Sequence, residues 1–224
     1  ARAPLSQNFS NVERPRSRTQ AERAALSDRL MTEAAIRLLV TQGVGGTTLR
    51  AIGEESGYSR GLATHRFGSK AGLFRHVLRH VSAEWVTRVE QAVGDQIGID
   101  ALTAVVDVQY NFIKDAPEKL RAMYILWMAS GDPASEFKTN VADVHRVQRS
   151  DVQRWVETGQ KTGIVRRQLC AERVSEQFVA LLLGITFQWL VNPQMPLFEM
   201  HEALKREIKF LLTPPGKQAR AAAL

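Results

Sequence analysis

The sequence predicts an all-α protein, and three observations support this fold class. Apolar residues recur at three- and four-residue spacing along most of the 224-residue chain, and no segment alternates as a half-buried strand does. No proline occurs between Pro15 and Pro117, which suits continuous helices. We expect a flexible basic arm over residues 1–20, a three-helix unit over 21–70, a larger helical domain over 71–213 that opens with a connecting helix over 70–93, and a flexible tail over 214–224.

The first helix is predicted to follow the basic arm and to end at Gly43. It would lie across the back of two short helices that come next and complete a three-helix core with them. Its apolar face repeats at helical spacing and consists of Leu26, Leu30, Ala34, Ala35, Leu38 and Leu39.

The stretch from Thr47 to Lys70 reads as two short helices joined by a tight turn, with a third helix directly after them. Thr48, Ser59 and Ser69 each offer a hydroxyl that can cap the start of one of these helices. Gly57 can take the positive φ with which a helix ends. Two short helices with a glycine-containing turn form a helix-turn-helix, whose second helix enters the DNA major groove.

The second short helix combines small side chains with long hydrogen-bond donors, which is what close reading of base edges requires. Arg60 and Arg66 suit guanine edges or phosphates, Thr64 suits a thymine methyl or a phosphate, and His65 suits either. Lys70 is a cation in a first helical turn, where the helix dipole favours an anion, so a DNA phosphate is its expected partner. The alternative is a small buried helical hairpin with solvated arginines.

The excess of positive charge lies entirely in the N-terminal third. Residues 1–80 hold 13 Lys/Arg and 6 Asp/Glu, whereas residues 81–224 hold 17 of each. A polyanion such as DNA is therefore the expected partner of this end. The basic arm can reach the DNA minor groove, or it can be a solvated tail or a contact to membrane or acidic protein.

The single cysteine, Cys170, rules out an intramolecular disulfide and fits a reducing compartment. We expect it to be a small core residue, with a redox role as the alternative. No apolar run is expected to reach the roughly 18 residues that a membrane span needs. The sequence shows no secretory signal, and we expect a cytoplasmic protein without membrane contact.

The C-terminal part ends in two apolar helical segments, Val174–Val191 and Leu197–Leu212. Gly184 in the middle of the first segment costs about 1 kcal/mol against alanine, which favours a close backbone approach there. Two such helices from each of two chains would form a four-helix homodimer interface. The alternative is that Val174–Val191 is simply the central core helix of one chain.

With these residues in view, the chain resembles the tetracycline-repressor (TetR) family of bacterial transcription regulators. The remainder of the chain resembles the family only in the number and length of its helices and in the closing apolar pair. The similarity is densest between about Ala24 and Phe74, and it is carried by Ala34, Ala35, Gly43, Thr47, Thr48, Ile52, Gly57, Tyr58, Ser59, Gly61, Phe67, Ser69 and Lys70.

The resemblance implies a set of DNA contacts. Thr64 and Arg66 depart from the family pattern, which commonly has tyrosine at the first position and histidine or tyrosine at the second. Arg66 can substitute for the phosphate contact that the tyrosine would make. The expected DNA-binding residues are Thr48, Arg50, Ser59, Arg60, Gly61, Leu62, Thr64, His65, Arg66 and Lys70.

The resemblance also implies a mechanism, in which a dimer represses transcription from a palindromic operator until a small-molecule effector enters the larger domain. Two heads in such a dimer meet half-sites about 34 Å apart. We expect no cofactor and no metal, since His145 has no second ligand near it in sequence. The candidate effector contacts, each of which can instead be ordinary core packing, are Tyr110, Met123, Tyr124, Trp127, His145, Trp155, Phe178 and Gln188.

Two other functions stay open at this point. The chain could be a helical enzyme whose basic end attracts an anionic substrate, but it has no recognisable catalytic motif. Its paired carboxylates in the head, Glu54 and Glu55, occupy adjacent helix positions that point in different directions. The chain could also be a DNA-binding module that responds to no ligand. We therefore expect a regulator that is not an enzyme.

Overall fold

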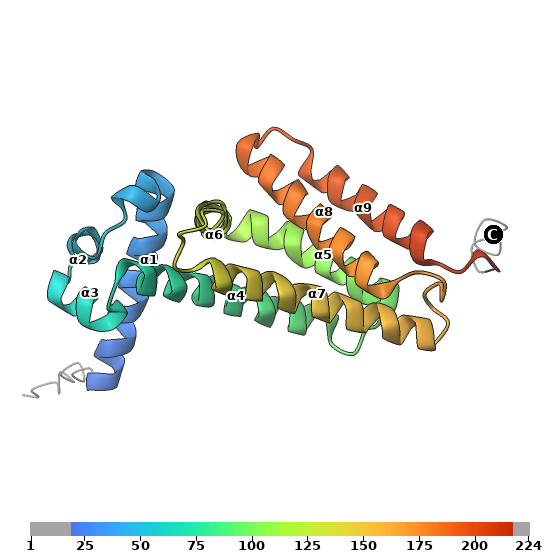
Figure 1. The fold of residues 1–224 in the computed structure, drawn as a ribbon, viewed down its shortest axis with the longest axis horizontal. Coiled ribbons are helices and arrows are strands. Elements are labelled where there is room, and N and C mark those ends of the chain that lie inside the picture. Colours follow the sequence, from blue (N-terminus) through green and yellow to red (C-terminus); the bar gives the residue numbers. More distant parts are fainter. Residues whose placement is uncertain (1–18, 217–224) are drawn as a thin grey trace, which may run out of the picture.

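The computed structural model describes residues 19–216, and these residues fold into α-helices without any strand (Figure 1). This confirms the all-α prediction. The predicted arm over 1–20 and the tail over 214–224 fall almost entirely outside the described residues. In chain order the helices are α1 (Gln20–Gly46), α2 (Leu49–Ser56), α3 (Arg60–Phe67), α4 (Lys70–Val93), α5 (Gly98–Asp115), α6 (Pro117–Ala129), α7 (Lys138–Lys161), α8 (Ala171–Val191) and α9 (Leu197–Leu212).

Helices α1 to α3 form a compact head at one end of the molecule (Figure 1). The side chains of Thr48, Ser59 and Ser69 accept hydrogen bonds from backbone N–H groups three residues later, at 3.1, 3.1 and 3.0 Å. Gly57 ends α2 with a φ of 77°. The predicted caps and the predicted turn are thus confirmed, and they set the direction in which α3 leaves the head.

The regular part of the first helix ends at Gly43, as predicted, but α1 continues beyond this break. Gly43 adopts a φ of 66° and kinks the helix, but one more turn carries α1 to Gly46. Thr47 explains the extension, because its hydroxyl donates to the Gly43 carbonyl at 2.8 Å and its buried side chain anchors the turn.

The core of the head is closed by Phe67, the last residue of α3. Phe67 is buried and its ring meets the His76 ring of α4 edge-on, with centroids 5.1 Å apart. The Thr32 hydroxyl donates to the Asp28 carbonyl at 2.7 Å, so it accepts from Nε2 of His76 at 2.9 Å. These contacts join α1, α3 and α4 around a single point.

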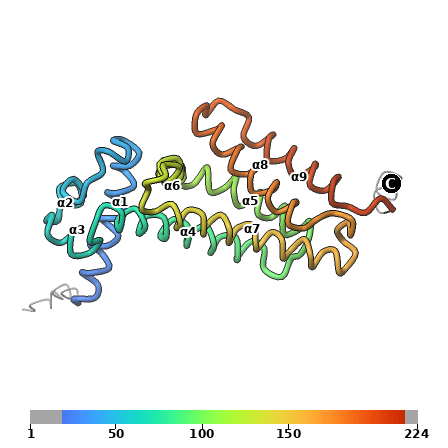
Figure 2. The backbone as a smooth tube through the Cα atoms, in the orientation of Figure 1, coloured from blue at the N-terminus to red at the C-terminus, as the bar shows by residue number. Residues whose placement is uncertain are grey.

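Helix α4 leaves the head and continues along the body, which is built from α5 to α9 (Figure 2). Helices α7 and α8 pack on one another, α5 contacts both α4 and α9, and α6 packs against α1 of the head. At the far end Arg166 binds the last carbonyls of α9: its backbone N–H donates to Leu212 at 2.9 Å and its Nε donates to Thr213 at 2.6 Å.

Two expectations about the C-terminal part are wrong. Helix α8 is long and apolar enough to cross a membrane, with a mean hydropathy of 1.5 over its most apolar window. Buried side chains of α8 such as Phe178 pack inside the body, and the core helix of a water-exposed protein passes the same test. Cys170 is exposed rather than buried, because it is the N-cap residue of α8, where the chain turns over the end of the helix bundle.

Replacing Gly53 by alanine should destabilise the head. A Cβ at Gly53 would lie 2.9 Å from the backbone nitrogen of Arg60 and 3.0 Å from the Tyr58 carbonyl oxygen, so α2 and α3 would have to separate. We expect a loss of about 1–3 kcal/mol in chemical denaturation followed by circular dichroism. Gly61→Ala is the matched control, because its Cβ would meet only the Ser59 hydroxyl at 3.6 Å. Equal stability of the two variants would contradict the close approach.

Candidate DNA-binding face and effector cavity

One side of α3 faces outward and carries most of the residues predicted to contact DNA. Ala63 and Phe67 are buried against the head, and the residues between and before them are exposed. Among the described residues, Arg60 and His65 have no side-chain hydrogen bond or ion pair, so their donors point to solvent without a protein partner. The outward residues of this face are Arg60, Gly61, Leu62, Thr64 and His65.

Arg66 has a partner within the head that the sequence did not predict. Its guanidinium forms an ion pair with Asp28 of α1, whose side chain is only 24% exposed. The pair fastens the C-terminal end of α3 to the first helix. Arg66 therefore has a partner within the head, as Arg50 has in Glu54, and its phosphate contact stays a prediction. Sequence spacing could not reveal this pair, since its members are 38 residues apart.

Lys70 and Arg50 flank the face of α3 at the edges of the head. The Lys70 ammonium donates to the Gly45 carbonyl at 3.2 Å, next to the free backbone groups at the start of α4. Arg50 pairs with Glu54 at 2.8 Å, and this hydrogen bond raises the pKa of Arg50 above its ordinary value. Both cations are thus held at the surface where a DNA backbone could meet them.

The hydroxyls of Thr48 and Ser59 each accept one hydrogen bond as caps of α2 and α3, which leaves their O–H groups able to donate to another partner. The carboxylates of Glu54 and Glu55 are also engaged: Glu54 binds Arg50, and Glu55 binds Arg37 at 3.0 Å. Two carboxylates held by separate arginines do not form the acid/base pair that the enzyme alternative would need.

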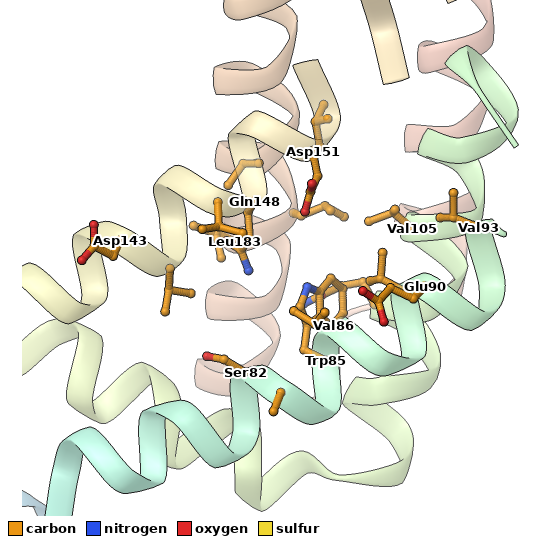
Figure 3. Close-up of a pocket in the computed structure, with 18 of the residues that line it drawn as sticks. Ser82, Trp85, Val86, Glu90, Val93, Val105, Asp143, Gln148, Asp151 and Leu183 are labelled. Atoms are coloured by element: carbon orange, nitrogen blue, oxygen red, sulfur yellow. The ribbon is translucent and has the colours of Figure 1, made fainter. Parts of the chain in front are cut away.

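The body contains a large cavity of about 660 Å³ between α4, α5, α7 and α8 (Figure 3). Of the predicted effector contacts, Trp155 and Phe178 line it. The sequence reasoning missed Ser82, Trp85 and Gln148, which line the same cavity from α4 and α7. The signal that could have found Ser82 is a polar residue on an otherwise apolar helical stripe, since it lies between buried Val81 and partly buried Trp85.

Three other predicted contacts gather at a second, more open pocket of about 490 Å³ between α6, α7 and α8. Tyr124 donates its hydroxyl to the Leu183 carbonyl at 2.7 Å, and burial raises the pKa of Tyr124 above its ordinary value. The rings of Trp127 and His145 meet edge-on with centroids 4.9 Å apart, and burial lowers the pKa of His145. The indole N–H of Trp127 and Nε2 of His145 are buried without a hydrogen-bond partner.

The last three predicted contacts do not join either group. Met123 lines a small cavity of about 30 Å³ that lies between the two larger ones and shares residues with both. Tyr110 packs against His201 of α9, with ring centroids 5.6 Å apart. Gln188 is exposed on α8. Within residues 19–216 no group of three or more His, Cys, Asp or Glu side chains is placed to hold a metal ion.

The sequence of the head is similar to a known protein family. The sequence model described as "Bacterial regulatory proteins, tetR family" matches residues 31–77, from the middle of α1 to the second turn of α4. The head of this chain is thus similar to the TetR family over these residues. A curated relative, the HTH-type transcriptional regulator BetI of Burkholderia thailandensis, is 26% identical over 102 residues, which cover 45% of this chain and 52% of BetI. The chain thus spans about half the length of the curated relatives it matches.

Solved structures extend the likeness in fold to the body of the chain. A putative TetR-family regulator from Rhodococcus sp. matches with a TM-score of 0.70 and 19% identity, covering 84% of this chain and all of that one. A putative transcriptional regulator from Saccharomonospora viridis in complex with choline matches with a TM-score of 0.74 and 19% identity, covering 85% and 99%. The nine described helices therefore follow the arrangement of TetR-type proteins.

His145 should make the stability of the protein depend on pH. Burial first, and the charge of Arg149 second, lower its pKa, so the folded protein keeps this ring neutral where the unfolded chain begins to bind a proton. The free energy of unfolding should therefore fall as the pH drops below about 6.5. In His145→Leu the decrease in urea midpoint from pH 7.5 to pH 5.5 should be smaller than in the parent. An equal or larger decrease would contradict this account.

Proposed function

We propose that this protein is a transcriptional regulator that binds duplex DNA through the outward face of α3. The observation that carries the proposal is that face itself, where Arg60 and His65 are exposed, beside small residues such as Gly61, and have no partner within residues 19–216. A helix can bring donors to base edges in the major groove only with such a face. The positive charge of residues 1–80 supports the same partner, because a polyanion attracts a basic surface.

A homodimer through α8 and α9 completes the proposal. Gly184 has no atom within 4 Å of the position a Cβ would take, so the close approach expected at this glycine is not made within the chain and is left for a second copy. Two copies would present two α3 helices to a palindromic operator. The apolar side chains exposed on α8 and α9 are Leu181, Phe187, Val191, Phe198, Phe210 and Leu211.

A small-molecule effector is the proposed signal, and the large cavity is its proposed site. Its volume of about 660 Å³ lies in the range of small-molecule pockets, and it borders α4, the helix that starts in the head. The S. viridis neighbour was solved with choline, which supports a ligand-binding role for this fold. Release of DNA on binding the effector, and hence repression in its absence, follows the family's usual mechanism; the protein would act in the cytoplasm.

DNA binding should respond differently to two substitutions in the head. After a bound sequence is selected from random DNA, Arg60→Ala should cost about 1–3 kcal/mol on that sequence and relax the choice of base. Lys70→Ala should weaken all sequences alike and reduce the salt slope of the binding constant by about 1. Fluorescence anisotropy at several salt concentrations measures both effects.

Arg146→Ala, which removes a 65% exposed arginine from α7, is the control and should bind DNA as the parent does. If Arg60→Ala and Lys70→Ala also bind as the parent does, α3 does not read DNA in the proposed way.

The dimer can be tested on α8. Leu181 is 49% exposed in the single chain, so Leu181→Glu should cost little within one chain. In a symmetric interface it would bring together two carboxylates, one from each copy, which would repel one another and lose their hydration. We expect the parent to sediment as a dimer and Leu181→Glu as a monomer with unchanged helix content. Val147→Glu on α7, where the parent side chain is 45% exposed, should stay dimeric. A dimeric Leu181→Glu variant would contradict the proposed interface.

A further inference from the structure

The large cavity is elongated rather than round. Its lining follows α4 from Arg75 to Gly94, which is about 28 Å of helix, whereas a sphere of 660 Å³ would be only about 11 Å across. Aromatic and aliphatic side chains from α4, α7 and α8, such as Trp85, Trp155 and Phe178, make up most of its wall. A long and narrow apolar molecule fits this shape better than a compact one.

The charged groups of the cavity lie at its rim and balance one another. None of them is a buried residue, and Asp151 and Asp143 are already paired with arginines of α7, Arg154 at 2.7 Å and Arg146 at 3.0 Å. A charged ligand group inside the cavity would lose its hydration without gaining a buried counter-charge, which is costly. The charged lining residues are three cations and three anions: Arg75, Arg79, Arg154, Glu90, Asp143 and Asp151.

Two neutral polar groups on facing helices lack the partners that such groups normally have (Figure 3). Ser82 on α4 has a buried hydroxyl without a hydrogen bond. A hydroxyl in a helix commonly donates to the carbonyl four residues earlier, as Thr87 of the same helix does at 3.0 Å. Gln148 on α7 has a buried Oε1 that accepts no hydrogen bond. By contrast, the side-chain amide of Gln153 on the same helix is engaged, since it donates to Glu157 at 2.8 Å. Both thus have hydrogen-bonding capacity left for a ligand.

Ser82 and Gln148 also share the small cavity of about 30 Å³ that adjoins the large one. This volume suffices for about one water-sized group. A single hydroxyl oxygen placed there can donate to Oε1 of Gln148 and accept a second hydrogen bond, while the apolar body of the same molecule fills the large cavity.

We propose that the cavity takes a neutral, elongated and mainly apolar ligand whose hydroxyl group is held between Ser82 and Gln148, a long-chain alcohol being its simplest form. The inference rests on the proposed function only in treating this cavity as the effector site. Ser82 and Gln148 are then the residues that select a neutral hydroxyl end over a charged one.

The test compares ten-carbon probes that differ only at one end: decan-1-ol, its methyl ether, decanoate and decyltrimethylammonium. Binding to the full chain without DNA is followed by the fluorescence of Trp85 and Trp155, which line the cavity, and by calorimetry. We expect decan-1-ol to bind at least about fivefold more tightly than the ether, which cannot donate a hydrogen bond, and more tightly than both ions.

Three variants assign this preference to its residues. Gln148→Leu should bring the alcohol and the ether to nearly equal affinity, and Ser82→Ala should reduce the alcohol's advantage. Gln153→Leu makes the same change on the same helix outside the cavity and should keep the parent's preference.

Four results would overturn the proposal: tighter binding of decanoate or of the cation, equal binding of alcohol and ether by the parent, an unchanged preference in Gln148→Leu, or no binding of any probe. DNA binding of the same preparations is measured separately. Failure to bind DNA would count against the proposed regulator and would leave the probe series as a separate test of the cavity.

Discussion

The structure depends on α4 being one uninterrupted helix that belongs to both the head and the body. A Cβ at Gly72 in its first turn would lie 2.0 Å from the Phe67 carbonyl oxygen, so the end of α3 and the start of α4 are in direct contact. One turn later His76 bonds to Thr32 of α1. From Arg75 onward the same helix lines the cavity. If a ligand displaces α4, the end of α3 that contacts α4 must therefore move with it.

A second connection prevents α4 from moving alone. Glu84 accepts hydrogen bonds from Lys119 of α6 at 2.5 Å and from Arg88 at 3.0 Å, and Arg88 also reaches Asp115 at the end of α5. Burial works to raise the pKa of Glu84, but the bonds from Lys119 and Arg88 outweigh it and the net pKa is lowered, so the carboxylate stays charged. Because α6 packs against α1, the head is linked to the body through two neighbouring helices, and its orientation follows the relative position of α4 and α6.

The features that sequence reasoning predicted correctly are those set by local chemistry. A hydroxyl at Ser59 and a glycine at Gly57 determine a cap and a turn within a few residues, so the exposed face of α3 follows from the sequence alone. The ion pair of Arg66 was not predicted, because its partner Asp28 lies on another helix. The eight predicted effector contacts were scattered for the same reason: aromatic spacing identifies buried stripes, but only the crossing of α4, α7 and α8 decides which stripes leave a cavity between them.

The unpartnered groups of Ser82 and Gln148 matter because burying them without a hydrogen bond lowers the stability of the ligand-free protein. A buried polar atom without a hydrogen bond costs about 1–3 kcal/mol, and an alanine or leucine at these positions would avoid that cost. A ligand hydroxyl that satisfies both groups removes the penalty only in the bound state, and it does so between α4 and α7. Part of the binding energy is thereby gained at α4, the helix that continues into the head. Occupation of the cavity can then change the position of α3, provided that these contacts are better in one position of α4 than in another.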